Sequence, residues 1–354
     1  MIDTSNFSHF ARPPLFLDDD ESIDEEGVRC YLCPNNCTVK SGSFGVCGVR
    51  GNKGGRGIIP FYGFISALAV DPVEKKPLYH FKPGSQILSL GFAGCNMRCP
   101  FCQNWHISQN TDIEGRWIKP GEIISSALGQ DTPSIAYTYS EPLVHAEYLL
   151  DCMTLARRHG IANVLVTNGC VNGEAAAEIL ELADAANVDL KSFSARTYKE
   201  MLGGDLQTTL DFIALCHEMG VHLEITTLVV PGLNDSMDEL DEAAEFIASL
   251  DSTGTGAKIP WHLSAYHPDY RWNAPATEPS FLLRAANKAR KKLAFVYTGN
   301  IASENDTHCP ACGAVLVRRR GYRIDPAGLK PCDSDGAEGK YKCAACGEFS
   351  QIIY

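Results

Sequence analysis

Short apolar runs alternate with helical patterns along most of the chain, and this alternation restricts the fold more than any other sequence feature. The runs carry few charges, as expected of strands that are covered on both faces of a sheet. Strands that alternate with helices form parallel sheets, so the pattern predicts an α/β fold: a complete or partial (β/α) barrel, or a large doubly wound sheet. The expected strands are residues 87–92, 134–139, 163–167, 187–192, 222–230, 261–266 and 294–299.

This pattern divides the chain into four expected parts. Residues 1–27 contain the acidic run DDDESIDEE and predict a flexible, solvated arm. Residues 28–86 form an expected Cys-rich module, in which residues 30–57 are rich in cysteine and glycine and too poor in apolar periodicity to build a core without bound metal. Residues 58–86 predict short strands and turns. The strand–helix series occupies residues 87–299, and residues 300–354 predict a zinc-ribbon-like tail.

Three cysteines with the spacing C-x3-C-x2-C directly follow the first expected strand: Cys95, Cys99 and Cys102. In parallel α/β proteins the carboxyl ends of the strands carry the chemistry, so the position of this triad indicates a functional site. Structural zinc and 4Fe–4S sites usually have four protein ligands, whereas three thiolates on a 4Fe–4S cluster leave one iron with an open position. We therefore interpret the triad as a catalytic metal site; incidental zinc binding and buried thiols are the alternatives.

Two further cysteine sets contain four members each. The C-terminal quartet consists of two C-x2-C-G knuckles, which predict a structural zinc site. Its members are Cys309, Cys312, Cys343 and Cys346. The N-terminal quartet has the spacing C-x2-C-x3-C-x9-C, which permits zinc, the ion we favour, or an auxiliary 4Fe–4S cluster. Its members are Cys30, Cys33, Cys37 and Cys47.

The overall composition narrows the partners and the compartment. A net charge of −12 disfavours a broad phosphate-binding surface, so nucleic acid is not expected as the main partner. No run of about 18 apolar residues occurs, so we expect no membrane-spanning helix. The N-terminus lacks a secretory signal pattern, and the fifteen cysteines mostly follow metal-ligand spacings. Both features predict a cytoplasmic protein without disulfides.

The triad, with Phe101 directly before its third cysteine and a strand directly before its loop, resembles the signature of the radical S-adenosylmethionine (SAM) superfamily. The resemblance implies a 4Fe–4S cluster whose open iron binds SAM, held in a partial (β/α)6-type TIM barrel. It further implies that one electron from a flavodoxin- or ferredoxin-type donor cleaves SAM to methionine and a 5′-deoxyadenosyl radical. That radical abstracts hydrogen from a substrate, so the cofactor carries the chemistry and the protein positions it.

Polar residues at the ends of later strands resemble the SAM-binding residues of this superfamily. Glu141 stands in Tyr-Ser-Glu-Pro, where the family carries a Gly-Gly-Glu-Pro-like motif, and is expected to bind the SAM ammonium group. A helix-start glutamate is the alternative. Asn168, Asp189 and Lys191 resemble the T-N-G and D-x-K segments of the pyruvate formate-lyase activating enzymes, which implies a place near the SAM ribose or carboxylate. A structural Asp–Lys pair is the alternative.

Two residues of the later strands complete the predicted site. Glu224 lies on the fifth expected strand and is expected to face the cavity with the other cofactor-binding residues. His267 follows the sixth expected strand, where a histidine can relay protons or contact the substrate as a catalytic group. A histidine that is satisfied by its neighbours agrees equally well with the sequence.

Longer stretches outside the triad narrow the resemblance to the AmmeMemoRadiSam-system radical SAM enzymes, which are relatives of the pyruvate formate-lyase activating enzyme. This resemblance covers nearly the whole chain and implies Memo-type and AMMECR-type proteins as partners, without defining the reaction. The stretches are CYLCPNNC (30–37), GVCGVRGN (45–52), DPVEKKPLYHFKPGS (71–85), GCNMRCPFCQNWHISQ (94–109) and YTGNI (297–301).

Three functions are compatible with these features. The first is a radical SAM enzyme that acts on a small molecule or a peptide. The second is an activase that installs a glycyl radical on a partner enzyme, as kinship with the activating enzymes implies. The third is a non-catalytic, metal-binding interaction module. Formation of 5′-deoxyadenosine from SAM distinguishes the first two from the third.

Overall fold

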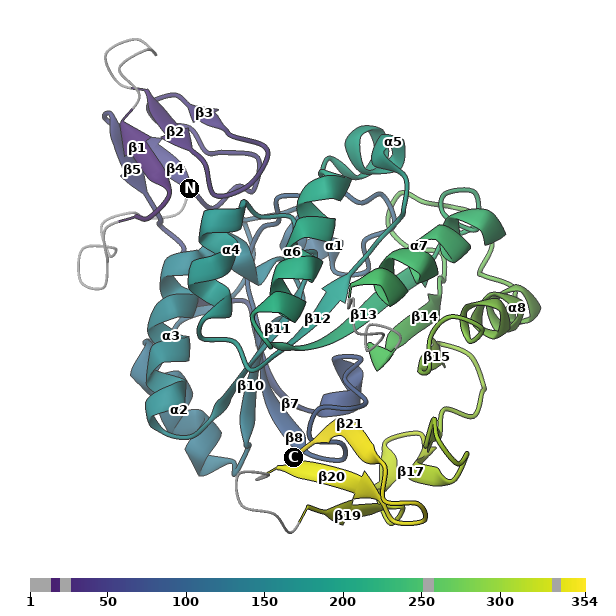
Figure 1. Ribbon diagram of the computed structural model, residues 1–354. Coiled ribbons are helices and arrows are strands. Elements are labelled where there is room, and N and C mark those ends of the chain that lie inside the picture. Colours follow the sequence, from purple (N-terminus) through teal and green to yellow (C-terminus); the bar gives the residue numbers. More distant parts are fainter. Residues whose placement is uncertain (1–13, 20–26, 251–257, 333–338) are drawn as a thin grey trace.

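The computed structural model describes residues 14–19, 27–250, 258–332 and 339–354, and Figure 1 shows their arrangement. An eight-stranded sheet forms the centre, with the order β15-β14-β13-β12-β11-β10-β8-β7. Its neighbours pair in parallel, except that β7 runs antiparallel to β8. The strands are β7 (Ala67–Pro72), β8 (Gln86–Gly91), β10 (Ser134–Thr138), β11 (Ala162–Thr167), β12 (Ala185–Asp189), β13 (His222–Val229), β14 (Trp261–Ala265) and β15 (Val296–Gly299).

The expected strands of the α/β series are therefore confirmed. The parallel strands stand in the sheet in the order in which they occur along the chain, as in a β/α barrel. A doubly wound sheet would reverse its order at a switch point, and this sheet does not. β15 and β7 stand at the two ends of the order, so the sheet is an open, partial barrel.

Helices cover the outer face of the sheet (Figure 1). They are amphipathic: α3, for example, buries Leu149, Leu150 and Met153 among the core residues. Side-chain caps begin some of them; Asp205 accepts a hydrogen bond from the Thr208 N–H at the start of α6. The helices are α2 (Pro120–Gly129), α3 (Ala146–Arg158), α4 (Gly173–Leu180), α6 (Leu206–Glu218), α7 (Met237–Ser249) and α8 (Pro279–Ala289). Shorter helical turns are η2 (Val73–Lys75), α1 (Trp105–Ser108), η3 (Pro142–His145), α5 (Ala195–Thr197) and η4 (Tyr198–Leu202).

The N-terminal module, at the upper left of Figure 1, contains a three-stranded sheet and a hairpin. Its strands are β1 (Leu17–Asp19), β2 (Val28–Cys30), β3 (Thr38–Val39), β4 (Gly51–Lys53) and β5 (Arg56–Ile58). The expected flexible arm is wrong for residues 14–19, because β1 pairs with β2 and the Phe16 side chain is 7% exposed. The Leu15 N–H also donates to the Glu147 carboxylate of α3. Residues 1–13 and 20–26 of that arm lie outside the described residues.

The strand β7 belongs to the central sheet, although the sequence pattern assigned it to the Cys-rich module. It pairs with β8 along its whole length, from Ala67 opposite Gly91 to Pro72 opposite Gln86. The short strands β6 (Phe64–Ile65) and β9 (Arg116–Trp117) pair beside it. The other expected domain boundaries stay predictions.

The C-terminal tail forms two three-stranded antiparallel sheets, shown in yellow and yellow-green at the bottom of Figure 1. Their strands are β16 (Thr307–His308), β17 (Val315–Arg320), β18 (Arg323–Asp325), β19 (Leu329–Pro331), β20 (Lys340–Cys343) and β21 (Phe349–Ile353). The tail thus lies at the end of the barrel away from the N-terminal module. Within the described ranges, no helix has the length and apolar character needed to cross a bilayer.

Candidate active site

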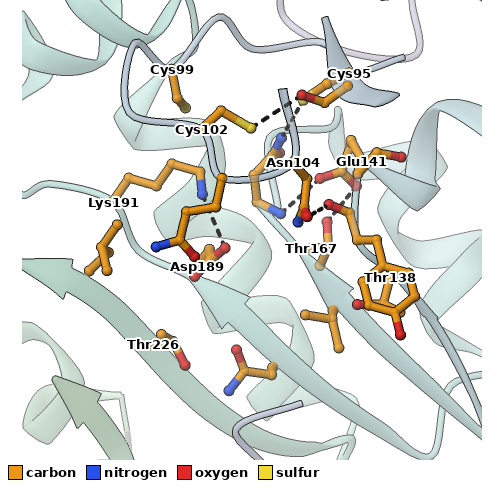
Figure 2. Close-up of a pocket in the computed structure, with 18 of the residues that line it drawn as sticks. Cys95, Cys99, Cys102, Asn104, Thr138, Glu141, Thr167, Asp189, Lys191 and Thr226 are labelled. Atoms are coloured by element: carbon orange, nitrogen blue, oxygen red, sulfur yellow. Dashed lines mark hydrogen bonds and ion pairs between the residues drawn. The ribbon is translucent and has the colours of Figure 1, made fainter. Parts of the chain in front are cut away.

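A pocket of about 360 Å³ opens at the carboxyl ends of the parallel strands, under the loop that follows β8 (Figure 2). The carboxyl ends of neighbouring parallel strands share one edge of the sheet, so side chains from distant parts of the sequence meet there. Residues predicted from the sequence line this pocket together: Cys95, Cys99, Cys102, Glu141, Asn168, Asp189 and Lys191.

The sulfurs of the triad receive polar contacts in the loop between β8 and α1. The Met97 N–H donates to Cys95 Sγ at 3.4 Å, and the Ser108 hydroxyl lies 3.2 Å from Cys102 Sγ. Burial raises the pKa of the Cys95 thiol well above its ordinary value and the pKa of Cys99 to about 12. These buried thiols stay protonated unless a bound metal takes the place of the protons.

The spacing of the triad suits a metal cluster better than a single ion. A tetrahedral zinc site with Zn–S bonds of about 2.3 Å places its sulfurs roughly 3.8 Å apart. In the described part of the chain, only the C-terminal quartet gathers three or more metal-ligand atoms that all lie within 4.8 Å of one another. The triad is not gathered that tightly. A cluster, in which each sulfur binds a different iron, does not require the sulfurs to surround one ion.

Glu141 lines the pocket and also begins the helical turn η3. Its buried carboxylate accepts hydrogen bonds from the Thr167 hydroxyl at 2.6 Å, the Asn168 N–H at 2.8 Å and the Leu143 N–H at 3.0 Å. Burial raises the pKa of Glu141 to about 7, although these donors act to lower it. The helix-start role is therefore confirmed, and a bond to the SAM ammonium group stays a prediction.

Asp189 ends β12 and Lys191 lies two residues further along the chain, and the two form an ion pair in the pocket (Figure 2). Lys191 Nζ lies 3.1 Å from Asp189 Oδ2. Burial acts to lower the pKa of Lys191, but the Asp189 carboxylate raises it above its ordinary value, so the side chain stays charged. Asn168 connects β11 to the triad loop, because its Nδ2 donates to Asn96 Oδ1 at 2.9 Å. The pocket therefore offers a cation and amide donors beside the triad.

Sequence reasoning missed a charged group at the same pocket. Lys76 is 2% exposed and forms an ion pair with Asp71 at 2.8 Å. The Tyr139 hydroxyl donates to the same carboxylate at 2.6 Å, and Lys76 Nζ lies 4.3 Å from the centre of the Tyr139 ring. Lys76 and Tyr139 both line the pocket. The only sequence signal was the presence of Asp71 and Lys76 within the quoted stretch 71–85, to which no role was assigned.

Two predicted site residues lie elsewhere. Glu224 on β13 is fully buried but is not among the residues that line the pocket, contrary to expectation. Its carboxylate lies 2.7 Å from His262 Nε2 and accepts hydrogen bonds from the N–H groups of Tyr79 and His80, which hold it inside the barrel. His267 is exposed and also lies outside the lining of the pocket, so its catalytic role stays a prediction.

The C-terminal quartet closes a compact site in the tail. Cys309 Sγ lies 3.7 Å from Cys346 Sγ, and Cys312 Sγ lies 3.7 Å from Cys343 Sγ. These separations match the roughly 3.8 Å edge of a tetrahedral site around one ion. The expected four-cysteine site is therefore confirmed, and its geometry suits a single metal ion.

The chain is similar to known proteins across the same regions. Residues 90–247 match the family model of the Radical SAM superfamily. The chain is 38% identical over 339 residues to the uncharacterized protein MJ0808 of Methanocaldococcus jannaschii, which covers 94% of this chain and 98% of that protein. It is 26% identical over 203 residues to the pyruvate formate-lyase 1-activating enzyme of Escherichia coli (strain K12), covering 55% of this chain and 80% of that enzyme. The chain belongs to the radical SAM superfamily and is a radical SAM enzyme.

Solved structures show related but distant folds. A domain of the pyruvate-formate lyase-activating enzyme from Bacteroides vulgatus covers 47% of this chain and 98% of that chain, with 20% identity and a TM-score of 0.40. A radical SAM methyltransferase from Sphaerobacter thermophilus covers 62% and 67%, with 14% identity and a TM-score of 0.48. These scores are too low to carry a functional comparison. Membership of the superfamily itself implies a 4Fe–4S cluster and SAM, and the three cysteines that line the pocket are the residues that would hold such a cluster.

Proposed function

We propose that this enzyme cleaves SAM at the pocket, with a 4Fe–4S cluster held by Cys95, Cys99 and Cys102. The observation that carries this proposal is the convergence of these three cysteines and four polar side chains on one pocket. The four polar residues are Glu141, Asn168, Asp189 and Lys191. Membership of an enzyme superfamily speaks against the third hypothesis, a non-catalytic interaction module.

The polar residues have distinct roles in this proposal. Cys95, Cys99 and Cys102 would hold the cluster, which would supply the electron needed to split SAM into methionine and a 5′-deoxyadenosyl radical. Lys191, held by its 3.1 Å ion pair with Asp189, binds the SAM carboxylate, and Asn168 binds beside it. Glu141 binds the SAM ammonium group, whose positive charge favours the ionised carboxylate.

We propose a small molecule or a peptide as the substrate, and membership of the AmmeMemoRadiSam system with Memo-type and AMMECR-type partners. Two of the stretches that resemble this system line the pocket. Lys75 and Lys76 come from residues 71–85, and Asn104 and Gln109 come from residues 94–109. The stretches that narrow the family thus contribute to the surface that a substrate would contact.

An activase that installs a glycyl radical on a partner enzyme is the second candidate. It is supported by the 26% identity to an enzyme named for the activation of pyruvate formate-lyase. The two candidates differ in what receives the radical. The activase requires a partner protein with a glycine that reaches the pocket, whereas the first candidate requires a substrate small or flexible enough to enter it.

The remaining assignments concern the tail, the electron donor and the compartment. We propose zinc for the C-terminal quartet, because its sulfur separations of 3.7 Å match a tetrahedral zinc site. A flavodoxin- or ferredoxin-type protein is the proposed electron donor. The cytoplasm is the proposed compartment, because all fifteen cysteines are free of disulfides.

Anaerobic reconstitution with iron, sulfide and SAM tests the proposed reaction. After reduction with dithionite, the wild-type enzyme is expected to form 5′-deoxyadenosine, measured by liquid chromatography and mass spectrometry. The variant Cys99→Ala is expected to form none above background. Cys216→Ala is the matched control with wild-type yield, because Cys216 is a buried thiol on α6 outside the three cysteine sets. Product from Cys99→Ala, or no product from the fully loaded wild-type enzyme, would contradict the proposal.

Electron paramagnetic resonance separates the two candidate functions. The activase is expected to give a glycyl-radical signal in a partner enzyme when that partner, SAM and reductant are combined. The first candidate gives no such signal and instead transfers deuterium from a labelled small molecule or peptide into 5′-deoxyadenosine. A glycyl radical formed in stoichiometric yield would favour the activase.

A further inference from the structure

The N-terminal quartet lies around the hairpin formed by β2 and β3. Cys30 ends β2 and Cys37 directly precedes β3, and the Cys30 N–H donates to the Cys37 carbonyl at 2.9 Å. Cys33 lies in the turn between them, and Cys47 lies in the loop before β4. Val46, directly before Cys47, donates its N–H to Cys37 Sγ at 3.3 Å, so the loop that carries Cys47 lies against the hairpin. The four cysteines therefore lie in one small region of the module.

Hydrogen-bond donors point at these sulfurs. The Val46 N–H donates to Cys37 Sγ at 3.3 Å, and Asn35 Nδ2 donates to Cys33 Sγ at 3.6 Å. Gly45 allows this close approach, because a Cβ at that position would lie 3.3 Å from Cys37 Sγ. Amide donors around sulfur are typical of metal-bound thiolates, whose charge and redox potential they adjust.

The spacing of the N-terminal quartet differs from that of the C-terminal quartet. The C-terminal sulfurs stand 3.7 Å apart in pairs, as around one ion. All four N-terminal cysteines are described, yet no three of their sulfurs lie within 4.8 Å of one another. The triad is likewise absent from the groups gathered that tightly, and its superfamily implies a 4Fe–4S cluster there. Among the described residues, the C-terminal quartet is therefore closed around a single-ion site, and the other two cysteine sets are not.

We infer that Cys30, Cys33, Cys37 and Cys47 hold a second iron–sulfur cluster of the 4Fe–4S type, in place of the zinc ion that the sequence spacing favoured. Four thiolates complete the protein ligands of such a cluster. Unlike the cluster at the triad, it has no open iron and takes no part in binding SAM.

This second site lies against the triad loop. Gly94, directly before Cys95, has a φ of +77° and packs so tightly that an added Cβ would lie 2.3 Å from the Cys47 carbonyl oxygen. Asn35 Nδ2 donates to the Asn96 carbonyl at 3.0 Å. One electron from a flavodoxin- or ferredoxin-type donor would enter here and leave toward the triad. No bond is made or broken at the four cysteines, so the site is returned to its starting state.

Metal analysis of the full-length chain without its triad tests the inference. The triple variant C95A/C99A/C102A, purified and reconstituted without oxygen, is expected to retain about four irons, about four sulfides and about one zinc per chain. Mössbauer spectra are expected to assign the iron to a 4Fe–4S cluster. Adding C33A and C37A to this variant is expected to remove the iron and leave the zinc. Adding Cys216→Ala instead is the matched control and leaves the iron in place.

Each outcome decides for or against the second cluster. About two zincs and no iron in the triple variant would overturn it, as would about one zinc and no iron, since the quartet would then be empty. If the triple variant does not fold, as judged by circular dichroism, the reconstituted wild-type chain decides. About eight irons with one zinc supports two clusters. About four irons with one or two zincs shows that only the triad holds a cluster.

Discussion

At the scale of single residues, Tyr139 has an unfavourable backbone conformation that its side-chain and backbone contacts stabilise. Its φ of +69° lies in the left-handed region, which costs about 1 kcal/mol or more for a residue other than glycine. The Gly-Gly-Glu-Pro-like motif of the family has glycine at this position, and glycine adopts the left-handed region freely. Here the hydroxyl bonds Asp71, the ring lies beside Lys76, and the carbonyl accepts a hydrogen bond from Asn104 at 2.7 Å. These contacts offset the strain.

Removal of the Tyr139 hydroxyl is therefore expected to destabilise the fold. Tyr139→Phe deletes a hydrogen bond to a charged acceptor, Asp71, and should lower the free energy of unfolding by about 1.5 kcal/mol or more. Tyr137→Phe, in the strand β10 that ends directly before Tyr139, is the matched control, since its hydroxyl bonds the neutral Asn163 at 3.2 Å and should contribute less. Urea unfolding under argon, followed by circular dichroism, measures both. Equal losses in the free energy of unfolding would show that the charged acceptor Asp71 gives no more stability than the neutral acceptor Asn163.

His80 is a second residue whose surroundings have a measurable consequence. The ring is fully buried, and its Nε2 lies 2.7 Å from the Tyr297 hydroxyl, which in turn lies 2.7 Å from Thr307 Oγ1. Burial lowers the pKa of His80 to about 3, although the nearby Glu224 carboxylate acts to raise it. The folded protein therefore keeps this histidine neutral where an unfolded chain would take up a proton.

This shift predicts a dependence of stability on pH. Below about pH 6.5 the unfolded chain protonates His80 and the folded chain does not, so stability falls by about 1.4 kcal/mol per pH unit toward pH 3. His80→Gln cannot titrate and should lose thermal stability less steeply between pH 7 and pH 5 than the wild type. Leu78→Ala, a buried change without titration, controls for general destabilisation and should keep the wild-type slope. If the thermal stability of His80→Gln fell with pH as steeply as that of the wild type, the lowered pKa would not belong to His80.

At the scale of elements, the loop after β8 is positioned by its contact with the N-terminal module. Gly94→Ala is expected to force the two apart, because the new Cβ would collide with the Cys47 carbonyl oxygen and the positive φ disfavours alanine. The variant should retain less iron after anaerobic gel filtration than the wild type. Gly121→Ala in α2 is the matched control, since nothing lies within 4 Å of its added Cβ and alanine favours helix. Full iron retention in Gly94→Ala would show that the close contact between Gly94 and the Cys47 carbonyl is not needed to hold the iron.

At the scale of the whole molecule, the C-terminal tail supports the end of the barrel opposite the pocket. The Ile353 N–H donates to the His80 carbonyl at 2.9 Å, and the Lys82 N–H donates to the Ile353 carbonyl at 2.7 Å. Arg319 donates to the Tyr79 carbonyl at 2.6 Å and lies over the Tyr79 ring. The tail thus holds the segment 79–82, whose backbone also bonds Glu224 inside the barrel.

Loss of the metal from the tail is therefore expected to loosen the barrel end. The variant Cys312→Ser should lose the metal of the quartet and show faster amide hydrogen exchange in residues 80–84 and 349–354, because their shared hydrogen bonds open more often. Exchange in β11 and β12 should not change. Cys332→Ser, a cysteine of the tail outside the quartet, is the matched control. Unchanged hydrogen exchange in Cys312→Ser would show that the metal of the tail does not stabilise this end of the barrel.

The order of strands and helices was readable from the sequence, because hydrophobic periodicity is local and each parallel strand is a short apolar run. The triad and the C-terminal quartet were readable for the same reason, since cysteine spacing is a property of one short segment. Asn168 and Lys191 line the pocket, where their position at strand ends and their resemblance to family segments had placed them. The expected cleavage of SAM came from resemblance to a family, because periodicity and cysteine spacing do not define a reaction.

Other features were decided only by the tertiary structure. Asp71 and Tyr139 are 68 positions apart in the sequence and meet only because β7 and β10 flank the same strand, β8. Glu224 belongs to an inward-facing strand position, but the depth of that position inside the barrel, set by packing, separates it from the pocket. The sequence by itself determined which elements and metal-binding segments form. The fold determined which of their side chains share a cavity and how far apart the sulfurs stand, because those distances depend on contacts between distant segments.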